Sequence, residues 1–414
     1  MDSTVCMKAL CLAGRIILEN GGETYRAEDT LIRMARALGL KDADVFAIPS
    51  GLFLSFTDEE GEHRTSISRV YLRGTNLSRV NRVNELSRAL TAGKLDPEEL
   101  LPRLLEAQKL GNRLPAWYEP LMAFITSASF AVMFGGGWLE ILLGGICGAL
   151  TQLMPRLLPR GDKSAGMSGT LFASIFCAFV PLTFRAVTGL CITEVVIAAA
   201  IMPLVPGLSM TNAMQDIMRG DMVSGVAHCA RAIMIAAMVA GGALVGTHLA
   251  SALGLMAQST TPASTLPFFT QAVLAFVGSF FAGVGFGALL HAPRKAILWS
   301  GFLGAAGYLT YWLCLQAAVA ETAAMFFGAL LASVGTQFAA RRFKMIATVF
   351  VTIAILPMVP GLGLYRAMSA LAQGALAQGG MIAAHTMALI IMIALGIGLG
   401  STLSGVRRRK VRKA

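Results

Sequence analysis

Two short stretches of this chain, Met202–Gly207 and Leu356–Gly361, place the pattern Pro-x-x-Pro-Gly inside long apolar runs. Proline removes a backbone donor and clashes with the preceding helical turn, and glycine adds conformational freedom at the same point. A helix in lipid cannot leave the freed backbone groups without partners unless protein, water or a ligand satisfies them. The pair therefore predicts two broken membrane helices at matched positions, which is the sequence signal of a transporter binding site.

Such breaks present backbone groups that suit a zwitterion. The N-terminus of each following half-helix carries partial positive charge and N–H groups that can bind a carboxylate. The carbonyl groups before the breaks, at Ile201, Met202, Ile355 and Leu356, would be free to accept from an ammonium group or a cation. An amino acid carries both groups, so we predict a small substrate of this kind.

Polar side chains follow both breaks. The predicted substrate-binding set consists of Pro203, Pro206, Gly207, Ser209, Thr211, Asn212, Asp216, Pro357, Pro360, Gly361, Tyr365 and Arg366. Helix capping or packing is an equally good explanation of Ser209 and Thr211. A charge within lipid is costly and therefore points to function, which favours Asp216 and Arg366 unless both lie at the membrane surface.

Proton coupling requires a titratable group within the membrane. The candidates are Glu194, Asp216 and His228. Glu194 lies near the end of its apolar segment, where solvation at the membrane surface is the alternative explanation. His228 follows the first broken segment by a turn or two, which is compatible with a proton role.

The composition is that of a polytopic membrane protein. Of 414 residues, 55% are hydrophobic and 14% are charged, with a mean hydropathy of +0.66; soluble proteins carry about a quarter charged residues. The net charge of +11 needs no nucleic acid, because membrane topology and anionic lipid explain basic loops and a basic tail. The cysteines form no C-x-x-C pair, and Walker, G-x-S-x-G and H-E-x-x-H motifs are absent, so we expect no metal, no cofactor and no enzyme activity.

Apolar segments of about 20 residues predict about ten spans. They lie at 118–134, 138–157, 166–186, 189–218, 223–250, 267–290, 294–314, 320–339, 344–373 and 378–402. Basic residues recur in alternate loops and in the tail: Arg156, Arg160, Lys163, Arg219, Arg294, Lys295, Arg341, Arg342, Lys344 and Arg407–Lys410. The positive-inside rule then predicts an inner-membrane protein with both termini in the cytoplasm.

The two halves of the membrane part repeat. At one constant offset Pro203, Pro206, Gly207, Met214, Gly220 and Gly242 match Pro357, Pro360, Gly361, Met368, Gly374 and Gly396. Five spans per repeat is an odd number, so the second copy must be inverted. We predict a cytoplasmic α+β domain at 1–113, a first five-helix repeat at 114–252, and a second repeat with the basic tail at 253–414.

The N-terminal segment has the patterns of a small α+β domain. Helices are expected at 4–20, 24–39, 76–90 and 97–110, and strands at 42–48, 52–58 and 65–72. Its best candidate site is a polar cluster made of Glu23, Arg26, Glu28 and Asp29. Acidic residues also favour a first helical turn, so helix capping is the alternative. We expect this cluster to act in regulation or assembly.

With these motifs the chain resembles the threonine/serine exporter family over nearly its whole length. The matching residues are Ala13-Gly14-Arg15, Glu23-Thr24-x-Arg26-x-Glu28-Asp29, Ile48-Pro49-Ser50-Gly51, Pro203–Gly207, Thr211-Asn212, Asp216, Gly220-Asp221, Pro357–Gly361 and Tyr365-Arg366. Met358 replaces a leucine that is frequent in the family, a change that conserves volume. The resemblance implies a cytoplasmic domain joined to ten spans and export of threonine or serine by proton exchange.

Three functional questions stay open from the sequence. Members of this family that divide the repeats between two chains resemble dicarboxylate exporters, so a C4-dicarboxylate such as succinate is the alternative substrate. A channel for small solutes is the second alternative, because two broken helices that meet in the membrane also occur in pores. Homo-oligomer formation is compatible with the sequence and is not specified by it.

Overall fold

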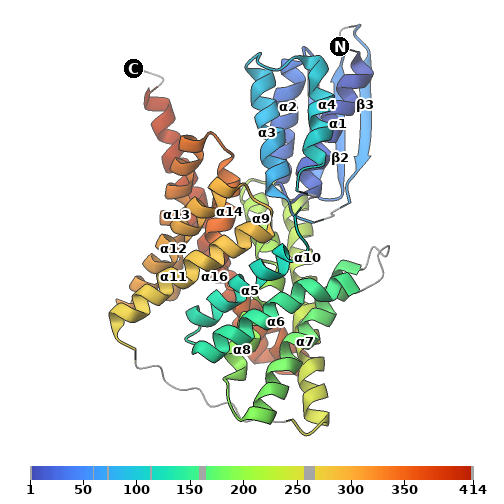
Figure 1. The fold of residues 1–414 in the computed structure, drawn as a ribbon. Helices are drawn as coiled ribbons and strands as arrows, with labels where there is room; N and C mark the ends of the chain where they lie inside the picture. The colour runs from blue at the N-terminus through green and yellow to red at the C-terminus, as the bar shows by residue number, and fades with distance from the viewer. Residues whose placement is uncertain are drawn as a thin grey trace.

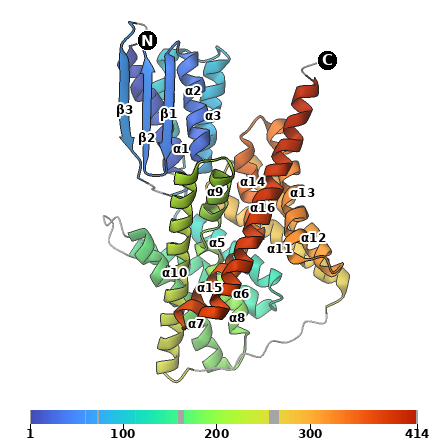
Figure 2. The ribbon, with the colours of Figure 1, turned by 180° about the vertical axis from the view of Figure 1, so that it is seen from behind.

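The computed structural model describes residues 2–58, 60–71, 74–111, 114–157, 165–255 and 266–411. The predicted loop charges Arg160 and Lys163 lie outside these residues, as do the side chains of Arg407–Lys410. Figures 1 and 2 show an N-terminal α+β unit at one end of a larger helical part. The α+β unit contains α1 (Ser3–Glu19), α2 (Thr24–Ala37), β1 (Lys41–Ile48), β2 (Gly51–Thr57), β3 (His63–Arg69), α3 (Leu77–Thr91) and α4 (Pro97–Gln108).

The three strands form an antiparallel sheet in the order β1-β2-β3, with Leu54 of β2 opposite Val45 and Ser66. Alternate side chains of a strand point to opposite faces. Leu52, Leu54 and Phe56 are buried against the helices, whereas Phe53 lies on the exposed face. All four predicted helices and all three predicted strands are present, with ends that differ by a few residues.

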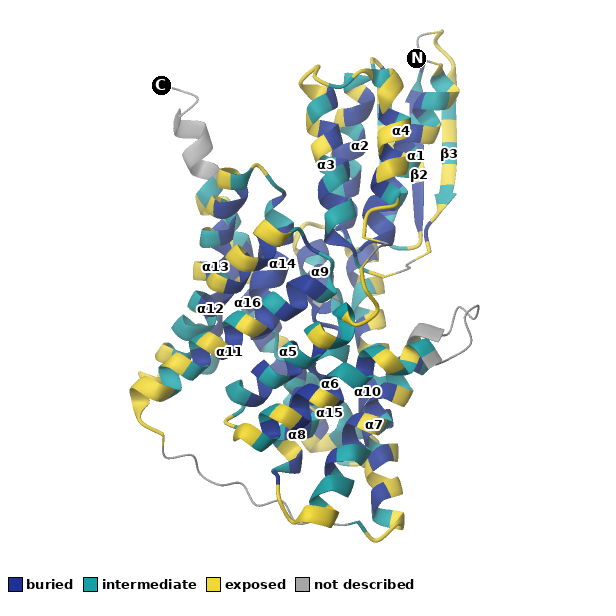
Figure 3. Cartoon of the chain, in the orientation of Figure 1, coloured by how far each residue is buried: buried dark blue, intermediate teal, exposed yellow. Residues whose placement is uncertain are grey.

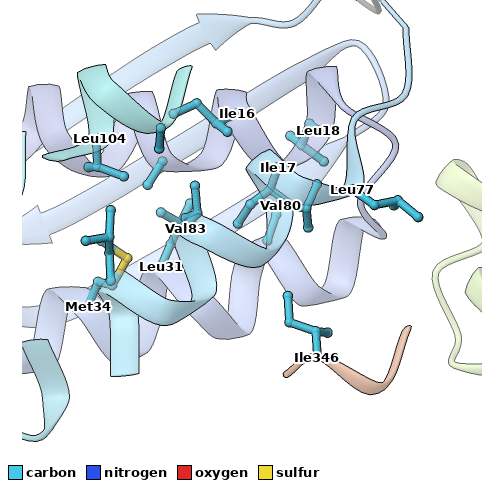
Figure 4. Packing of buried hydrophobic residues seen from close by; sticks show 14 of the residues in the cluster. Ile16, Ile17, Leu18, Leu31, Met34, Leu77, Val80, Val83, Leu104 and Ile346 are labelled. Carbon is cyan, nitrogen blue, oxygen red and sulfur yellow. The ribbon is translucent and has the colours of Figure 1, made fainter. Parts of the chain in front are cut away.

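Apolar side chains from all four helices of the α+β unit form its core. Figure 4 shows Ile17, Leu31, Val83 and Leu104 together, and beside them Ile346 from the segment that precedes α14. The same buried cluster continues into the helical part through residues such as Ala288, Val349 and Phe350. The α+β unit is therefore joined to the helical part by shared apolar burial as well as by polar contacts.

Twelve α-helices and two short 3₁₀ turns make up the described helical part. They are α5 (Tyr118–Met133), α6 (Trp138–Leu157), α7 (Ala165–Thr188), α8 (Thr193–Ile201), η1 (Met202–Leu204), α9 (Gly207–Met218), α10 (Met222–Ala252), α11 (Phe268–Leu289), α12 (Arg294–Gln316), α13 (Glu321–Phe343), α14 (Ala347–Ile355), η2 (Leu356–Met358), α15 (Gly361–Ala372) and α16 (Leu376–Val411). Exposed residues lie along the outward faces of these helices (Figure 3). Many of them are large apolar residues, as expected for surfaces that face lipid.

Each predicted span corresponds to a helix or to a bent pair of helices. Six helices are long and apolar enough to cross a membrane, and the two bent pairs raise the number to eight. Among the described residues, α5 and α12 do not meet these criteria; α5 has only 16 residues, and a bilayer requires about 20. The structure thus supports six to eight spans, fewer than the ten predicted.

The two bent pairs are the predicted broken helices. The chain turns by 57° between Thr193–Leu204 and Ser209–Met218, and by 54° between Ala347–Met358 and Gly361–Ala372. Sharp kinks in helices occur where proline or glycine interrupts the hydrogen-bond ladder. The Pro-x-x-Pro-Gly motif therefore produces nearly the same bend twice.

Packing within the first five-helix set matches packing within the second. α5 packs against α6 and α8, and α11 packs against α12 and α14 in the same way. α10 lies against α7, as α16 lies against α13. Each half-helix packs chiefly on the last helix of its own set, α9 on α10 and α15 on α16. Each also contacts the last helix of the other set, because α9 meets α16 and α15 meets α10.

The two bent pairs run in opposite directions relative to the α+β unit. The hydroxyl of Thr24 donates to Asp221 Oδ2 at 2.8 Å, just beyond the end of α9. The hydroxyl of Thr348, in the first turn of α14, donates to Glu23 Oε2 at 3.0 Å. The first pair therefore ends at the α+β unit and the second pair begins there. α16 also ends on this side of the molecule (Figures 1 and 2).

Glycines on the last helix of each set allow close backbone contact. A Cβ on Gly242 of α10 would lie 2.5 Å from the carbonyl oxygen of Leu171 on α7. The matching Gly396 of α16 would place a Cβ 2.8 Å from the carbonyl oxygen of Phe326 on α13. Small residues at such crossings are the usual means of close helix packing in membranes.

This contact predicts that Gly242→Leu destabilises the protein, by at least the ~1–3 kcal/mol typical of overpacking. The adjacent Gly241 offers a matched control, because a Cβ there meets nothing within 4 Å. Thermal unfolding and size-exclusion chromatography of the purified variants in detergent test this. Equal stability of Gly242→Leu and Gly241→Leu would contradict the α7–α10 contact.

Candidate functional site

The backbone at both breaks has the same conformation. Val205 and Val359 are extended, and the N–H groups of Gly207 and Gly361 donate across the intervening proline to the carbonyls of Val205 at 2.8 Å and Val359 at 2.7 Å. Each following half-helix begins at the glycine. A short turn at each break thus bends the chain, and its backbone hydrogen bonds are made locally.

The prediction of free carbonyl groups before the breaks is wrong for three of the four positions. The N–H of Val205 donates to the carbonyl of Met202 at 3.2 Å, and the N–H of Val359 reaches the carbonyls of Ile355 and Leu356, both at 3.2 Å. The 3₁₀ turn explains the difference for Met202 and Leu356, since its i to i+3 bonds use these acceptors. The carbonyl of Ile355 accepts through an i to i+4 bond from the same N–H of Val359. These carbonyls are therefore not reserved for a cation or an ammonium group.

The two breaks pack against each other. A Cβ on Gly361 would lie 2.5 Å from Cγ1 of Val205, and a Cβ on Gly207 would lie 3.0 Å from Cδ2 of Leu356 and 3.6 Å from Cγ1 of Val359. Each glycine of one motif thus faces the apolar residues of the other motif. The crossing therefore brings together four residues of the predicted binding set, which stand at the starts of α9 and α15: Pro206, Gly207, Pro360 and Gly361.

Two cavities lie beside the crossing. One is very small, about 10 Å³, and is lined by Thr211, Val359 and residues of α16. The other, of about 220 Å³, reaches Pro203, Val205 and Leu356 and is also lined by Gln152, Glu119 and Thr75. Thr75 belongs to the α+β unit, so this second cavity approaches the breaks from the side of that unit.

Side chains after the first break serve their own helix or are buried beside it. The hydroxyl of Thr211 donates to the carbonyl of Gly207, four residues earlier, at 2.9 Å, which is a bond within its own helix and not a helix cap. Asn212 is buried and Ser209 is half-buried. On the second motif Pro357 lies near Gly283 of α11, with its Cγ 3.8 Å from the position of a Cβ there.

Asp216 lies at the centre of a polar cluster between α9, α10 and α2. Its side chain is fully buried, and its Oδ2 lies 3.8 Å from Nε2 of His228. The hydroxyl of Thr24 lies 3.5 Å from its Oδ1. Among the described residues, Oδ2 has no hydrogen-bond donor. A buried polar oxygen without a donor is costly, which distinguishes Asp216 from an ordinary structural carboxylate.

The turn after α9 explains how Asp221 joins this cluster. Gly220 has a φ of +90°, and the N–H of Asp221 donates back to the carbonyl of Asp216 at 3.0 Å. This arrangement is a helix C-terminus closed by a left-handed glycine. Asp221 then caps α10 through Ser224 N at 3.2 Å while its other oxygen accepts from Thr24.

Glu23 and Arg26 of the predicted N-terminal cluster also lie at this interface. Glu23 is 1% exposed, and its Oε2 accepts from Arg26 Nε and from Thr348, each at 3.0 Å. The guanidinium of Arg219 lies over the ring of Tyr25, 3.5 Å from its centroid. Cation–π contact of this kind adds to the attachment between the α+β unit and the end of α9.

Glu28 and Asp29 have other roles in the structure. Glu28 accepts from the N–H of Ala47 at 2.8 Å and so ties α2 to β1. Burial raises the pKa of Glu28 above its usual range, with this hydrogen bond acting in the opposite direction. Asp29 forms an exposed pair with Arg33 at 2.9 Å.

The other predicted site residues are not brought to Asp216. Glu194 is exposed in the first turn of α8, and Asp216 lies at the opposite end of the same bent pair. This exposure is compatible with the alternative interpretation, solvation of Glu194 at the membrane surface. Arg366 is exposed on α15, and Tyr365 packs on the apolar cluster around Met202 and Leu356. Asp216 and Arg366 therefore do not form one charged site.

Several residues of the interface were missed as site residues from the sequence. They are Thr24, Tyr25, Arg219, Asp221 and Thr348, together with Glu119, which pairs with Arg156 at 2.5 Å and lies 3.4 Å from His291. Thr24 and Asp221 stood inside the motifs that carry the family resemblance, which was a usable signal. No spacing rule links Glu23 to Thr348, its partner in the structure.

One acidic group of the described residues has the spacing of cation ligands: Asp58, Glu60 and Glu62, in the turn between β2 and β3. The oxygens of Asp58 accept from Arg64 Nε at 2.7 Å and from the N–H groups of Glu60 and Glu62. These donors already satisfy the carboxylate, so the group is explained as the support of a tight turn.

Paired broken helices that cross between two similarly packed helix sets define a multi-pass membrane protein of the transporter class. The chain belongs to the threonine/serine exporter family. Residues 8–250 match the family described as "Putative threonine/serine exporter", and residues 275–403 match "Threonine/Serine exporter, ThrE". No solved structure matches the chain.

Relatives with curated names cover most of the chain. A probable threonine/serine exporter of Mycobacterium tuberculosis is 26% identical over 94% of this chain and 75% of its own length. The threonine/serine exporter of Corynebacterium glutamicum is 26% identical over 96% and 82%. A probable succinate transporter subunit, YjjP, of Escherichia coli is 26% identical over 55% of this chain and 88% of its own length.

The contact between the breaks predicts that Gly361→Ala destabilises the protein by ~1–3 kcal/mol, through a clash with Val205. Adding Val205→Ala should recover most of this loss, because it removes the clashing Cγ1. A double-mutant cycle measured by thermal unfolding tests the coupling. Gly380→Ala is the control, since a Cβ there meets nothing within 4 Å. Strictly additive effects of the two substitutions would refute the contact.

Proposed function

We propose that this chain is an inner-membrane secondary transporter that exports small hydroxylated amino acids, threonine and serine. The observation that carries the proposal is the crossing of the two Pro-x-x-Pro-Gly breaks between two helix sets. Family membership and the names of the relatives from Mycobacterium and Corynebacterium give the substrate class. In this view no chemical conversion occurs, and the protein changes only which side of the membrane can reach the breaks.

Alternating access is the motion that we infer for this architecture. We divide the chain into the α+β domain at 1–113 and inverted five-helix repeats at 114–252 and 253–414. The matched packing pairs and the opposite directions of the bent helices support this division. In such transporters each repeat can adopt the conformation of the other. The binding site can therefore close to one side of the membrane and open to the other without a change of fold.

The substrate path is proposed to begin at the cavity beside Pro203, Val205 and Leu356. Its polar lining residues Gln152 and Glu119 lie on the side of the α+β unit. Substrate entering there would meet the half-helix N-termini at Gly207 and Gly361, whose partial positive charge suits a carboxylate. Substrate specificity would come from side chains that follow the two breaks: Ser209, Thr211, Asn212, Tyr365 and Arg366.

Orientation follows from the basic residues. Those that the structure describes include Arg219, which contacts Tyr25, and Lys344, whose carbonyl accepts from Arg88 at 2.8 Å. Both therefore lie next to the α+β unit. Under the positive-inside rule this side is cytoplasmic, and both termini are assigned there.

Proton coupling is assigned to Asp216 and His228. The buried oxygen of Asp216 has no hydrogen-bond donor among the described residues, and the imidazole lies 3.8 Å from it. Such an oxygen can take up a proton without breaking an existing bond. Glu194 is a weaker candidate because it is exposed at the far end of its helix.

A C4-dicarboxylate exporter is the alternative function, and the name of the YjjP relative favours it. The second alternative is a channel. Both can be separated from the main proposal by flux measurements, because a carrier saturates and exchanges substrate across the membrane. Whether the chain acts as a homo-oligomer does not affect this distinction.

The transport prediction concerns proteoliposomes loaded with labelled threonine, serine or succinate. We expect saturable efflux of threonine and serine, accelerated by the same unlabelled amino acid on the other side. Succinate should be transported at least about tenfold less efficiently, a discrimination of ~1.4 kcal/mol. Preferred efflux of succinate would show that the substrate is a dicarboxylate. Efflux that unlabelled amino acid on the other side does not accelerate would favour a channel.

The coupling prediction concerns Asp216→Asn. This variant should still bind threonine, but a proton gradient should no longer stimulate its transport, because the amide cannot carry the proton. Glu99→Gln removes a carboxylate of α4 that forms an exposed ion pair with Arg103, and it should behave as the unmodified protein. Proteoliposome flux with and without an imposed pH gradient gives the comparison. A gradient response in Asp216→Asn equal to that of the control would exclude Asp216 as the proton carrier.

A further inference from the structure

A large basic cleft separates the α+β unit from the second helix set. Its volume is about 700 Å³, and six cationic residues line it: Arg26, Arg33, Arg88, Arg219, Arg341 and Lys344. The remaining lining residues are polar or apolar, and no acidic residue is among those that the structure describes there. The cleft is distinct from the cavity at the breaks, which shares none of these residues.

The carboxylates beside the cleft, Glu23 and Asp29, pair with two of the six cations, Arg26 and Arg33. Arg219, Arg341 and Lys344 form no ion pair with any described carboxylate. Arg341 donates to the carbonyl of Ser404, and Arg219 stacks on Tyr25. Arg26 pairs with Glu23, which also accepts from Thr348, and Asp29, the partner of Arg33, is exposed. Like charges that face one cleft repel each other, and a bound anion removes that cost.

Membrane topology alone does not explain the cleft. The positive-inside rule concerns short loops near span ends, and three of the six cations, Arg26, Arg33 and Arg88, come from α2 and α3 of the α+β unit. The other three come from the ends of membrane helices. The charges of two separate parts of the fold therefore converge on one space.

We propose that this cleft binds a phosphate-bearing polyanion that bridges the α+β unit and the helical part. Five guanidinium groups suit phosphate, because each can donate two parallel hydrogen bonds to its oxygens. The volume falls in the range of ~300–1,000 Å³ that is usual for sites of small ligands and cofactors. A C4-dicarboxylate carries only two charges and would engage only part of this lining.

The walls of the cleft connect a ligand to both broken helices. Arg219 follows the end of α9 directly, and Met345, Ile346 and Ala347 lead into α14. Arg26 also contacts Glu23, which accepts from Thr348. A polyanion in the cleft therefore touches the α+β-side ends of both bent pairs and holds them against the same unit. The proposal concerns binding, and it stands whether or not threonine is the transported substrate.

Two sources could supply this chemistry, a soluble polyphosphate compound such as a nucleotide or the headgroup of an anionic phospholipid. The test uses the purified full-length protein and two phosphate-bearing probes, with succinate titrated in the same way as a comparison. Tripolyphosphate is titrated in neutral detergent without anionic lipid, and binding is followed by calorimetry. Nanodiscs with phosphatidylglycerol or with phosphatidylcholine alone are then compared by thermal unfolding, with and without tripolyphosphate.

The cleft variant is Arg33→Gln/Lys344→Gln, and the control Lys94→Gln/Arg103→Gln removes the same charge at exposed positions outside the cleft. We expect the cleft variant to bind tripolyphosphate about tenfold or more weakly and the control to stay within about twofold of the unmodified protein. The charge-conserving Arg33→Lys/Lys344→Arg should retain binding, which separates loss of charge from misfolding.

Each outcome decides the proposal. Cleft-dependent binding of tripolyphosphate in detergent supports a soluble ligand, and cleft-dependent stabilisation only by phosphatidylglycerol supports a lipid headgroup. Equal weakening by the cleft and control variants would mean that only overall charge matters, and this overturns the site. Binding of succinate as tight as that of tripolyphosphate overturns the phosphate assignment. Failure of both probes to bind overturns the proposal entirely.

Discussion

Inside a membrane, every backbone N–H and C=O group must find a partner within the protein or in a water-lined space. The two Pro-x-x-Pro-Gly breaks meet this requirement by the same local means. A 3₁₀ turn uses the carbonyls before each break, and a tight turn around the second proline uses the N–H of the glycine. Because the break is satisfied locally, the helix can bend by more than 50° in both copies and the two copies can pack directly on each other.

The α+β unit depends on the same crossing. It contacts the end of the first bent pair through Thr24 and Asp221, and the start of the second through Glu23 and Thr348. Ile346 extends its apolar core into the segment that precedes α14. Any relative movement of the two broken helices therefore changes the contacts at the N-terminus of α2, where buried carboxylates and arginines lie together.

The sequence predicted the large features because they rest on local chemistry. Proline and glycine positions fixed both breaks, and alternation fixed the three strands of the sheet. Free carbonyls at Met202, Ile355 and Leu356 were predicted wrongly, because helix geometry alone does not indicate that the turn at each break will use them. The joining of Glu23 to Thr348 and the separation of Arg366 from Asp216 arise from long-range packing, which no local pattern records. The basic cleft was invisible for the same reason, since its arginines are far apart along the chain.

The contact of α9 with the last helix of the second set has a consequence for the order of synthesis. α9 packs on α16, and α16 comprises the last described residues, 376–411. The first broken helix therefore leaves the ribosome well before α16 has been synthesised. The side of α9 that carries Met210 and Met214 contacts Ile390 of α16, so this side has no partner in α16 until translation has nearly ended.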